Sequence, residues 1–434
     1  MKLKPIIGFE VHVELNTKSK MFCGCPANHF AKKPNTQTCP VCLGLPGALP
    51  VPNQKAIENI ISIGLAFNCQ INKKSKFDRK HYFYPDLPKG YQISQYDQPI
   101  CSKGEIILDS GKKIRIRRIH MEEDTAKMIH KTLNGEQVSL IDFNRSGVPL
   151  VELVTEPDLS SAEEAKEMLK QIHATIKALG VSDADMEKGS MRLEANISVG
   201  DPKNLPNYKV EVKNVNSFRY ISKAIDYEIK RQTKLLKSNQ QPKQETRGWD
   251  RNNNKTFTQR IKETEADYRY FPEPDIPPLN IPDELINKLQ QNLPHLPKEI
   301  IQKLTKLGIE LRFAKLISKD PNLVQIIHAL TSDKKINANK LANLLTNGKL
   351  DPKKSLQLIK EDYLKQTKLG TTDHKTIQKF IDQVINDNST IVSAYKGGKE
   401  NAIGPLIGKV LTLSKGQADP VTVRQLLLKT LQTQ

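Results

Sequence analysis

Five prolines within eleven residues constrain the fold of this chain more than any other stretch: Pro272, Pro274, Pro277, Pro278 and Pro282. Proline fixes its own φ angle and lacks a backbone N–H, so such a run excludes a helix and the interior strand of a sheet. We therefore expect a boundary between two structural regions here. A chain of 434 residues is long enough for two or three domains with substantial cores.

Before this boundary the sequence mixes strand-like and helix-like patterns. Apolar and polar residues alternate in 114–117 and 210–213, as they do in half-exposed strands. A capping box at Ser160 or Ser161 begins a predicted helix, an apolar stripe follows, and Gly180 ends it. We expect this helix to cover one face of a sheet.

The polar stretch 240–255 predicts a long exposed loop, and its Trp249 suggests that this loop folds over a site. After the prolines, every periodic segment is helical, and Gly, Pro and Asn residues separate one segment from the next. The expected helices cover 283–293, 297–307, 336–347, 353–368, 373–387 and 420–432. A second break at 331–335 divides this part into two helical units.

Four cysteines near the N-terminus have a spacing similar to that of a zinc knuckle. Thirteen residues separate Cys23 and Cys25 from the pair Cys39 and Cys42, and nearby Gly and Pro residues provide tight turns. Four thiolates surround Zn2+ tetrahedrally and leave no position open, so we expect a structural zinc rather than a catalytic one. The alternative is four reduced cysteines that bind no metal.

The net charge of +19 favours a polyanionic partner, and nucleic acid is the natural one. Residues 297–434 hold 23 Lys and Arg but only 12 Asp and Glu, and Lys outnumbers Arg there by 21 to 2. Such a surface suits contact with a phosphate backbone more than the reading of bases. The alternative explanation is a general preference of the source genome for lysine.

Several classes of protein are not expected. The sequence has no apolar run of about 18 residues and no secretory leader, so we expect a soluble cytoplasmic protein without a membrane span. Cys69 and Cys101 show no pairing pattern, which fits a reducing compartment. There is no P-loop, no dinucleotide-binding fingerprint and no glutaminase-like nucleophile segment. Any amide nitrogen used in a reaction must therefore come from another chain.

Three segments could supply ligands for a hard metal ion. Glu10 and His12 are two residues apart, so on a strand they lie on one face while Val11 and Val13 lie on the other. The acidic run 122–124 and the lone Glu152 within an apolar segment add carboxylates. Carboxylates with an imidazole suit Mg2+ or Mn2+. The alternatives are an ordinary surface pair and a solvated acidic turn.

Long motifs are spread along nearly the whole chain: Gly8–Leu15, Cys39–Gly47, Phe77–Gln95, His120–Asp124, Leu193–Asn196, Lys213–Phe218, Asp267–Asp275, Gly397–Gly404 and Ser414–Pro420. Together they resemble the GatB family, the B subunits of heterotrimeric aspartyl/glutamyl-tRNA(Asn/Gln) amidotransferases. This chain has Leu193-Glu194 at two positions where members of the family often have Cys-Asp.

The resemblance implies an α+β fold in three parts. An antiparallel-sheet cradle domain over 1–290 holds the zinc knuckle and the ATP and Mg2+ site. An all-α connector over 291–332 follows. An all-α tail over 333–434, similar to the YqeY proteins, contacts the body of the tRNA.

The resemblance also implies the chemistry of the site. The enzyme phosphorylates the misacylated residue of Glu-tRNA(Gln) or Asp-tRNA(Asn) with ATP, and ammonia from a partner glutaminase then completes the transamidation. The implied Mg2+ ligands, which are also the catalytic residues, are Glu10, His12, Glu123 and Glu152. Plausible clamps for phosphate or carboxylate are Arg79, Arg192 and Lys213, and Tyr82, Asp86 and Asn214 are further candidates for the pocket.

The implied partners are an amidase A subunit, which delivers ammonia through a tunnel, a small C subunit and the misacylated tRNA. The alternative to a catalytic subunit is a zinc-containing scaffold that binds tRNA and only presents it to a partner. A hard-metal cluster distinguishes the two hypotheses, because a scaffold has no use for one. The sequence does not separate Glu-tRNA(Gln) from Asp-tRNA(Asn) as the substrate.

Overall fold

The computed structural model describes residues 3–213, 215–261, 268–333, 335–367, 374–414 and 418–433. The chain divides into two compact units, Met1–Leu296 and Pro297–Gln434. The division lies after the proline-rich segment 272–282.

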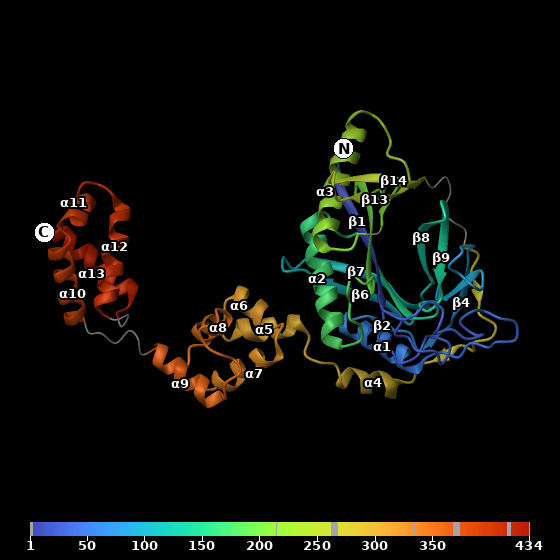
Figure 1. Cartoon of the computed structure of the whole chain (residues 1–434), viewed down its shortest axis with the longest axis horizontal. Helices are drawn as coiled ribbons and strands as arrows, with labels where there is room; N and C mark the ends of the chain where they lie inside the picture. The colour runs from blue at the N-terminus through green and yellow to red at the C-terminus, as the bar shows by residue number, and fades with distance from the viewer. Residues whose placement is uncertain are drawn as a thin grey trace. The chain divides into compact units, whose positions relative to one another are not determined.

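A nine-stranded sheet forms the framework of the first unit, in the order β14-β13-β12-β11-β1-β10-β7-β6-β2 (Figure 1). Neighbouring strands are antiparallel except β12 and β13, which are parallel. The strands are β1 (Lys4–Glu14), β2 (Gln70–Ile71), β6 (Cys101–Ile107), β7 (Lys113–Glu123), β10 (Pro149–Thr155), β11 (Met191–Gly200), β12 (Val210–Val212), β13 (Glu245–Asp250) and β14 (Lys255–Ile261). The expectation of a largely antiparallel sheet is thus confirmed.

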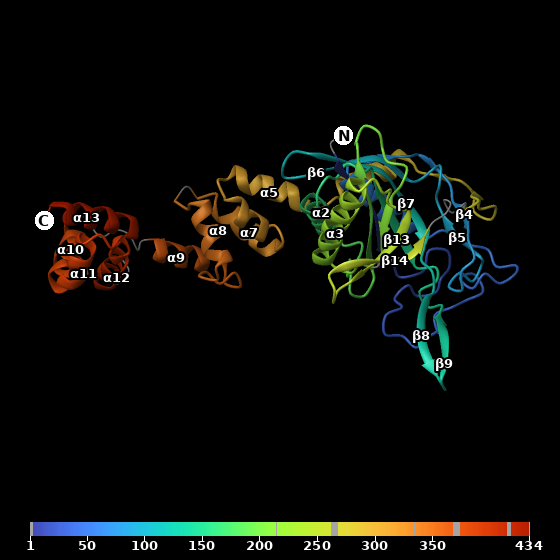
Figure 2. The ribbon, with the colours of Figure 1, turned by 90° about the horizontal axis from the view of Figure 1, so that it is seen from above.

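Smaller strands surround this sheet. Two short ladders combine β15 (Phe271–Pro272), β4 (Asp78–His81) and β5 (Tyr91–Ser94), and β16 (Leu279–Asn280) with β3 (Lys74–Ser75). A two-stranded ribbon of β8 (Lys127–Leu133) and β9 (Glu136–Asp142) projects away from the sheet, as Figure 2 shows.

Three helices cover one face of the large sheet: α1 (Gln54–Ala66), α2 (Ala162–Leu179) and α3 (Phe218–Lys237). Helices α2 and α3 lie side by side along this face (Figure 1). Val11 and Val13 of β1 are buried in the same core, as predicted. The short helix α4 (Asp283–Gln291) packs against α1. Because these helices pack on one face of the large sheet, the polar side chains of its strands lie on the opposite face.

Local signals explain α2. The hydroxyl of Ser161 accepts a hydrogen bond from the backbone N–H of Glu164 at 3.1 Å, so Ser161, not Ser160, is the N-cap. Gly180 ends the helix with φ of 66°, a left-handed conformation that favours glycine. The predicted helix is therefore confirmed.

The prediction of a long exposed loop over 240–255 is wrong. Strand β13 begins at Glu245 and pairs with β14, and both extend the large sheet. Trp249 lies within β13 and packs, partly buried, against the core. It belongs to a strand and not to a loop that folds over a site.

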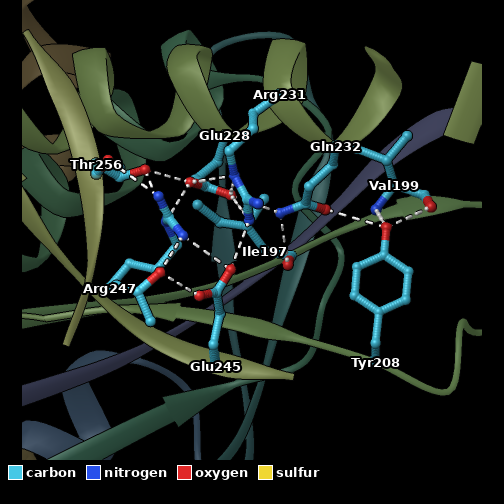
Figure 3. Close-up of polar contacts among 10 residues, drawn as sticks. Ile197, Val199, Tyr208, Glu228, Arg231, Gln232, Glu245, Arg247 and Thr256 are labelled. Carbon is cyan, nitrogen blue, oxygen red and sulfur yellow. Dashed lines mark hydrogen bonds and ion pairs between the residues drawn. The ribbon is translucent and has the colours of Figure 1, made fainter. Parts of the chain in front are cut away.

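Buried ion pairs explain how so polar a segment forms β13, an interior strand of the sheet (Figure 3). The guanidinium of Arg247 lies 3.0 Å from the carboxylate of Glu228 on α3 and 2.9 Å from that of Glu245. Arg231 contacts the same two carboxylates, at 2.9 and 3.1 Å. The hydroxyl of Thr256 donates a further hydrogen bond to Glu228, at 2.5 Å. These charges are paired inside the protein, whereas the composition alone suggests that water solvates them.

The second unit is helical, as predicted. Its helices are α5 (Pro297–Lys306), α6 (Leu311–Ile317), α7 (Pro321–Leu330), α8 (Ala338–Thr346), α9 (Leu356–Thr367), α10 (His374–Asp387), α11 (Ser389–Lys396), α12 (Ile403–Leu413) and α13 (Pro420–Thr433), with a 3-10 turn at Glu400–Ala402. The sequence analysis missed α6, α7, α11 and α12. Within the part of the chain that the structure describes, no helix is long and apolar enough to span a membrane.

Two hydrophobic cores lie within this helical unit. One joins buried residues between Leu304 and Tyr363, and the other joins residues between Ile377 and Leu431. The first core contains Leu330 and Ile336, which lie on opposite sides of the predicted boundary between residues 332 and 333. The division into connector and tail stays a prediction. A truncated chain must keep the residues of this first core together.

Candidate functional site

The face of the sheet opposite helices α1, α2 and α3 carries a row of polar side chains from neighbouring strands. Glu152 of β10 pairs with His12 of β1 on one side and with His120 of β7 on the other. Residues directly opposite each other in paired strands project to the same face. The register therefore places these three side chains together.

The side chains form a compact cluster of imidazoles and carboxylates. The Nε2 atom of His12 lies 3.5 Å from Glu152 Oε2 and 3.7 Å from Glu122 Oε1. The Nε2 atom of His120 lies 3.3 Å from Glu152 Oε2 and 3.9 Å from Glu122 Oε2. Glu122, Glu152 and His120 are buried.

Mutual attraction sets the protonation of this cluster. Burial alone lowers the pKa of His12, but the surrounding carboxylates, Glu152 foremost, raise it to about 9. Burial alone raises the pKa of Glu152, but the imidazoles of His120 and His12 hold it well below its ordinary value. The cluster therefore pairs anionic carboxylates with a proton on His12, a proton that a bound cation would displace.

The donor atoms fit a hard divalent cation. Ligand atoms of His12, Glu122 and Glu152 all lie within 4.8 Å of one another. Nδ1 of His12 is buried and has no hydrogen-bond partner among the residues that the structure describes. Two carboxylates with an imidazole suit Mg2+ or Mn2+, which also keep waters and substrate phosphates as ligands.

A second group of carboxylates lies beside the first. Glu10 of β1 pairs with Glu194 of β11, and Glu211 of β12 completes a group whose ligand atoms also lie within 4.8 Å of one another. Burial, followed by the charges of the neighbouring carboxylates, raises the pKa of Glu10. The amide of Asn196 donates a hydrogen bond to Glu10 Oε1 at 2.9 Å.

Two cations lie next to these carboxylates. The ammonium of Lys213 is 2.8 Å from Glu194 and 3.2 Å from Glu211. Arg192 pairs with His12 across β11 and β1, and its guanidinium forms a short ion pair with Asp124. Two of the three predicted clamps, Arg192 and Lys213, therefore lie on the polar face, where they can bind anionic groups brought to the cluster.

The four cysteines form a separate cluster. The sulfur atoms of Cys23, Cys25, Cys39 and Cys42 lie within 4.8 Å of one another. A hydrogen bond from Cys23 lowers the pKa of Cys42 to about 4, and the nearby ammonium of Lys20 contributes to this shift. Four sulfurs at this spacing can hold a tetrahedral metal ion such as zinc.

Lys20 joins this cluster to the strands of the site. Its side chain is fully buried, and its ammonium donates to the carbonyls of Gln37 and Phe143, at 2.8 and 3.3 Å, and to the Cys42 sulfur at 3.6 Å. Phe143 lies between β9 and β10. The cysteine segment therefore holds the chain that leads into the strand of Glu152.

Comparison with known proteins identifies the family of this chain. Residues 5–287 match the GatB/GatE catalytic domain, and residues 290–431 match the GatB domain. The chain belongs to the GatB family. Among its relatives, the B subunit of the aspartyl/glutamyl-tRNA(Asn/Gln) amidotransferase of Thermosipho melanesiensis is 41% identical, over 96% of this chain and 97% of the relative.

Further GatB relatives match over a similar length. The protein of the same name from Thermotoga maritima is 40% identical over 100% of both chains. One from Clostridium acetobutylicum, whose name carries the additional number 2, is 42% identical, over 99% of this chain and 100% of the relative. The family membership inferred from the motifs is thus confirmed.

The structure brings three of the four metal ligands implied by the GatB resemblance to the polar face, namely Glu10, His12 and Glu152. The carboxylate of Glu123 lies elsewhere. Its Oε1 atom contacts the ammonium of Lys89 at 2.6 Å and accepts a hydrogen bond from the backbone N–H of Ile93 at 3.0 Å. It also lines a cavity of about 100 Å3 next to the cysteine cluster. The neighbouring Glu122 lies with His12 and Glu152 instead.

The remaining pocket candidates have other environments. Arg79 is held by Glu273 through two hydrogen bonds, at 2.7 and 2.8 Å. The hydroxyl of Tyr82 lies 3.4 Å from Gln92 Oε1. Burial raises the pKa of Asp86. Asn214 lies outside the described residues.

Sequence reasoning did not single out His120, named Glu122 only within the acidic run 122–124, and missed Lys80. Glu122 and Glu152, together with nearby tyrosines, raise the pKa of Lys80 although burial alone lowers it, so this ammonium belongs to the same electrostatic environment. A signal for the first two was present. Ile119 and Met121 are apolar and alternate with His120 and Glu122, which indicates that the latter pair shares the polar face.

Proposed function

We propose that this chain is the carboxylate-activating subunit of a tRNA-dependent amidotransferase, the activity that its GatB relatives are named for. The cluster of His12, Glu122 and Glu152 carries the proposal, because it offers a hard-metal site on the polar face of the sheet. A scaffold that only binds tRNA needs no such site. The implied cofactor is Mg2+, and ATP is a substrate.

The proposed reaction has two steps. An oxygen of the tRNA-borne γ-carboxylate of Glu, or β-carboxylate of Asp, attacks the γ-phosphorus of ATP, and ADP leaves. The acyl phosphate provides a leaving group that a free carboxylate lacks. Ammonia then attacks the carbonyl carbon, phosphate departs with the C–O electron pair, and the nitrogen loses a proton. The products are amidated tRNA, ADP and phosphate.

The chain's own residues have definable roles in this reaction. His12, Glu152 and one carboxylate of the pair Glu122 and Glu123 would hold the metal ion, with Glu10 beside them. Bound Mg2+ would neutralise charge on the phosphate oxygens. Arg192 and Lys213 offer charged donors to the transferring phosphoryl group or to the substrate carboxylate.

The rest of the chain supports this site in the proposal. Zinc in the cysteine cluster stabilises the segment that leads into β10. The helical unit, with 23 Lys and Arg against 12 Asp and Glu, binds the body of the tRNA in the cytoplasm. An amidase A subunit and a small C subunit complete the enzyme, and the A subunit supplies the ammonia.

The deciding experiment compares Glu152→Gln with wild type in the purified three-subunit complex. Glutamine keeps the size of the side chain but removes the charge that holds the cation. Amidation of each misacylated tRNA and tRNA-dependent ATP hydrolysis should fall by at least about 100-fold, while tRNA affinity stays unchanged. Glu163→Gln, an exposed change in the first turn of α2, is the matched control.

A pair of neighbouring variants identifies the remaining ligand. The GatB resemblance assigns Glu123, and the distances favour Glu122. Glu122→Gln should therefore lower Mg2+ affinity in the complex more than Glu123→Gln does. If Glu152→Gln complexes amidate tRNA at the wild-type rate under saturating Mg2+, the cluster is not catalytic and the scaffold alternative holds.

Added ammonium salt should support amidation without the A subunit's glutaminase.

A further inference from the structure

A groove of about 730 Å3 lies at the β2 edge of the large sheet, away from the residues assigned above. Its floor includes Gln70, Ser102 and Arg118, which pair with one another across β2, β6 and β7. Arg118 is two residues before His120 on β7, so it projects to the same face. The groove therefore continues the polar face beyond the metal-type cluster.

The lining of the groove is strongly basic. Lys73, Lys74, Arg117 and Arg118 line it, and Asp97 is the one carboxylate among the described lining residues. A cleft in which positive charges outnumber negative ones concentrates anions and favours an anionic ligand.

Two of these cations are available to a ligand. Lys73 pairs with Asp283 at 2.8 Å, and Arg117 pairs with a carboxylate outside the groove. Among the residues that the structure describes, no carboxylate forms an ion pair with Lys74 or Arg118. The guanidinium of Arg118 donates a hydrogen bond to His120 Nδ1 at 3.4 Å.

A tyrosine pair forms one wall of the groove. The rings of Tyr96 and Tyr270 stack with centroids 4.2 Å apart and planes 9° apart. Tyr96 lines the groove and is 50% exposed, so Tyr270 supports one side of its ring while much of the residue remains accessible. Such a supported aromatic ring is a platform on which a base can stack.

We propose that this groove binds a nucleotide, with its base on Tyr96 and its phosphate against Lys74 and Arg118. The inference rests on the proposed function, in which both substrates carry nucleotides: ATP, and the 3′ end of the tRNA next to the misacylated residue. Either one must approach the cluster of His12, Glu122 and Glu152. Arg118 links groove and cluster, because His120 lies 3.4 Å from its guanidinium and 3.3 Å from Glu152.

The test measures binding to the full three-subunit complex. The probes are a non-hydrolysable ATP analogue with Mg2+, and an unacylated RNA hairpin with a short single-stranded 3′ end. Loss of base stacking costs about 1–3 kcal/mol, so Tyr96→Ala should weaken one probe by roughly 5- to 150-fold. Tyr96→Phe keeps the ring and should bind like wild type, which controls for damage to the fold.

Charge is tested separately. Lys74→Gln should weaken the same probe, and for the RNA it should reduce the log–log salt slope by roughly 0.7 for each phosphate that the protein no longer neutralises. Lys55→Gln is the matched control, because Lys55 is an exposed lysine of α1 that does not line the groove.

The outcomes separate the two sources of nucleotide. Weakening of the ATP analogue alone assigns the groove to ATP, and weakening of the RNA alone assigns it to the 3′ end. Unchanged binding of both probes in Tyr96→Ala and Lys74→Gln overturns the proposal. Binding is measured without turnover. Unchanged binding in these variants therefore differs from a failure of the proposed function, in which the wild-type complex itself would amidate no tRNA.

Discussion

The buried ion pairs between α3 and β13 predict a large loss of stability when Arg247 is replaced by Met (Figure 3). Methionine replaces the apolar stem of arginine but lacks the guanidinium and its charge. In wild type, two guanidiniums, those of Arg231 and Arg247, balance the carboxylates of Glu228 and Glu245. Arg247→Met leaves two buried carboxylates against one guanidinium.

The structure indicates the magnitude. Glu228 is 0% exposed and Arg247 is 8% exposed, so water cannot replace the lost partner. Removal of one member of a buried ion pair costs about 3–5 kcal/mol. With an m value of about 2 kcal/mol per M of urea, the unfolding midpoint of the first unit should fall by roughly 1.5–2.5 M.

The chain contains a built-in reporter for this measurement. Trp249 is its only tryptophan and lies in β13, two residues after Arg247. Urea unfolding followed by tryptophan fluorescence therefore reads out this strand. Arg260→Met, at an exposed position of β14, is the control and should change the free energy of unfolding by less than about 0.5 kcal/mol.

A double variant tests the physical reason. If the cost of Arg247→Met comes from an unbalanced carboxylate, then Glu228→Gln in the same chain restores neutrality and recovers part of the stability. The two changes should then be non-additive by about 0.5–3 kcal/mol. Strict additivity, or a cost of Arg247→Met no larger than that of Arg260→Met, would refute the reasoning.

Three further predictions concern other parts of the chain. Wild type should contain one zinc, and Cys39→Ser with Cys42→Ser should lose it in metal analysis, whereas Cys69→Ser, outside the cluster, should keep it. Hydrogen bonds from Arg117 lower the pKa of Glu156 below its ordinary 4.5. This ion pair therefore stabilises the folded protein at pH values above 4.5, and the stabilisation is lost as the pH falls through the pKa of Glu156 in the folded state. The difference in urea midpoint between wild type and Glu156→Gln should therefore shrink on acidification. Residues 368–434 hold nine Lys and Arg against five Asp and Glu. Their deletion should reduce the log–log salt slope of tRNA binding by roughly 0.7 to 0.9 for each phosphate that the tail neutralises, without loss of ATP hydrolysis. An unchanged slope would contradict a tRNA-binding tail.

The choice of residue 368 for that deletion comes from the structure and not from the sequence. A cut near residue 335, at the break suggested by the sequence, would remove Leu341 and Tyr363 from the core that also contains Leu304. Loss of tRNA binding would then reflect an opened core. A cut at 368 leaves the residues of that core together.

Elements with strong local signals were predictable. Helix α2 has an N-cap at Ser161, an apolar stripe and a left-handed Gly180, and each signal acts within a few residues. Helix α7 has a local signal that the sequence analysis overlooked, an N-cap at Asp320 followed by Pro321, whereas α12 has no side-chain cap. Helix α12 contains Gly404, Pro405 and Gly408, residues that usually separate helices, and its burial around Leu406 and Val410 overrides their weak propensity.

Elements that depend on distant partners were not predictable. Strand β13 has a polar sequence, and only α3, β12 and β14 bring the groups that pair its charges. Thr246 of this strand also donates a hydrogen bond at 3.0 Å to Glu211 of the second carboxylate group. A segment that composition assigns to solvent is therefore part of the support of the candidate site.

The adjacent carboxylates Glu122 and Glu123 show how far a motif can specify a site. A one-residue shift moves a strand side chain to the other face, so neighbours in one motif can have unrelated environments. Ile119 and Met121 are buried in the helix-covered core, and β7 therefore turns Glu122 towards His12. The motif identifies the acidic segment, but the register of β7 against β10 and β1 selects the carboxylate that reaches the imidazole. Which carboxylate binds the metal ion in this chain therefore depends on strand pairing, and variants of single residues can test the assignment.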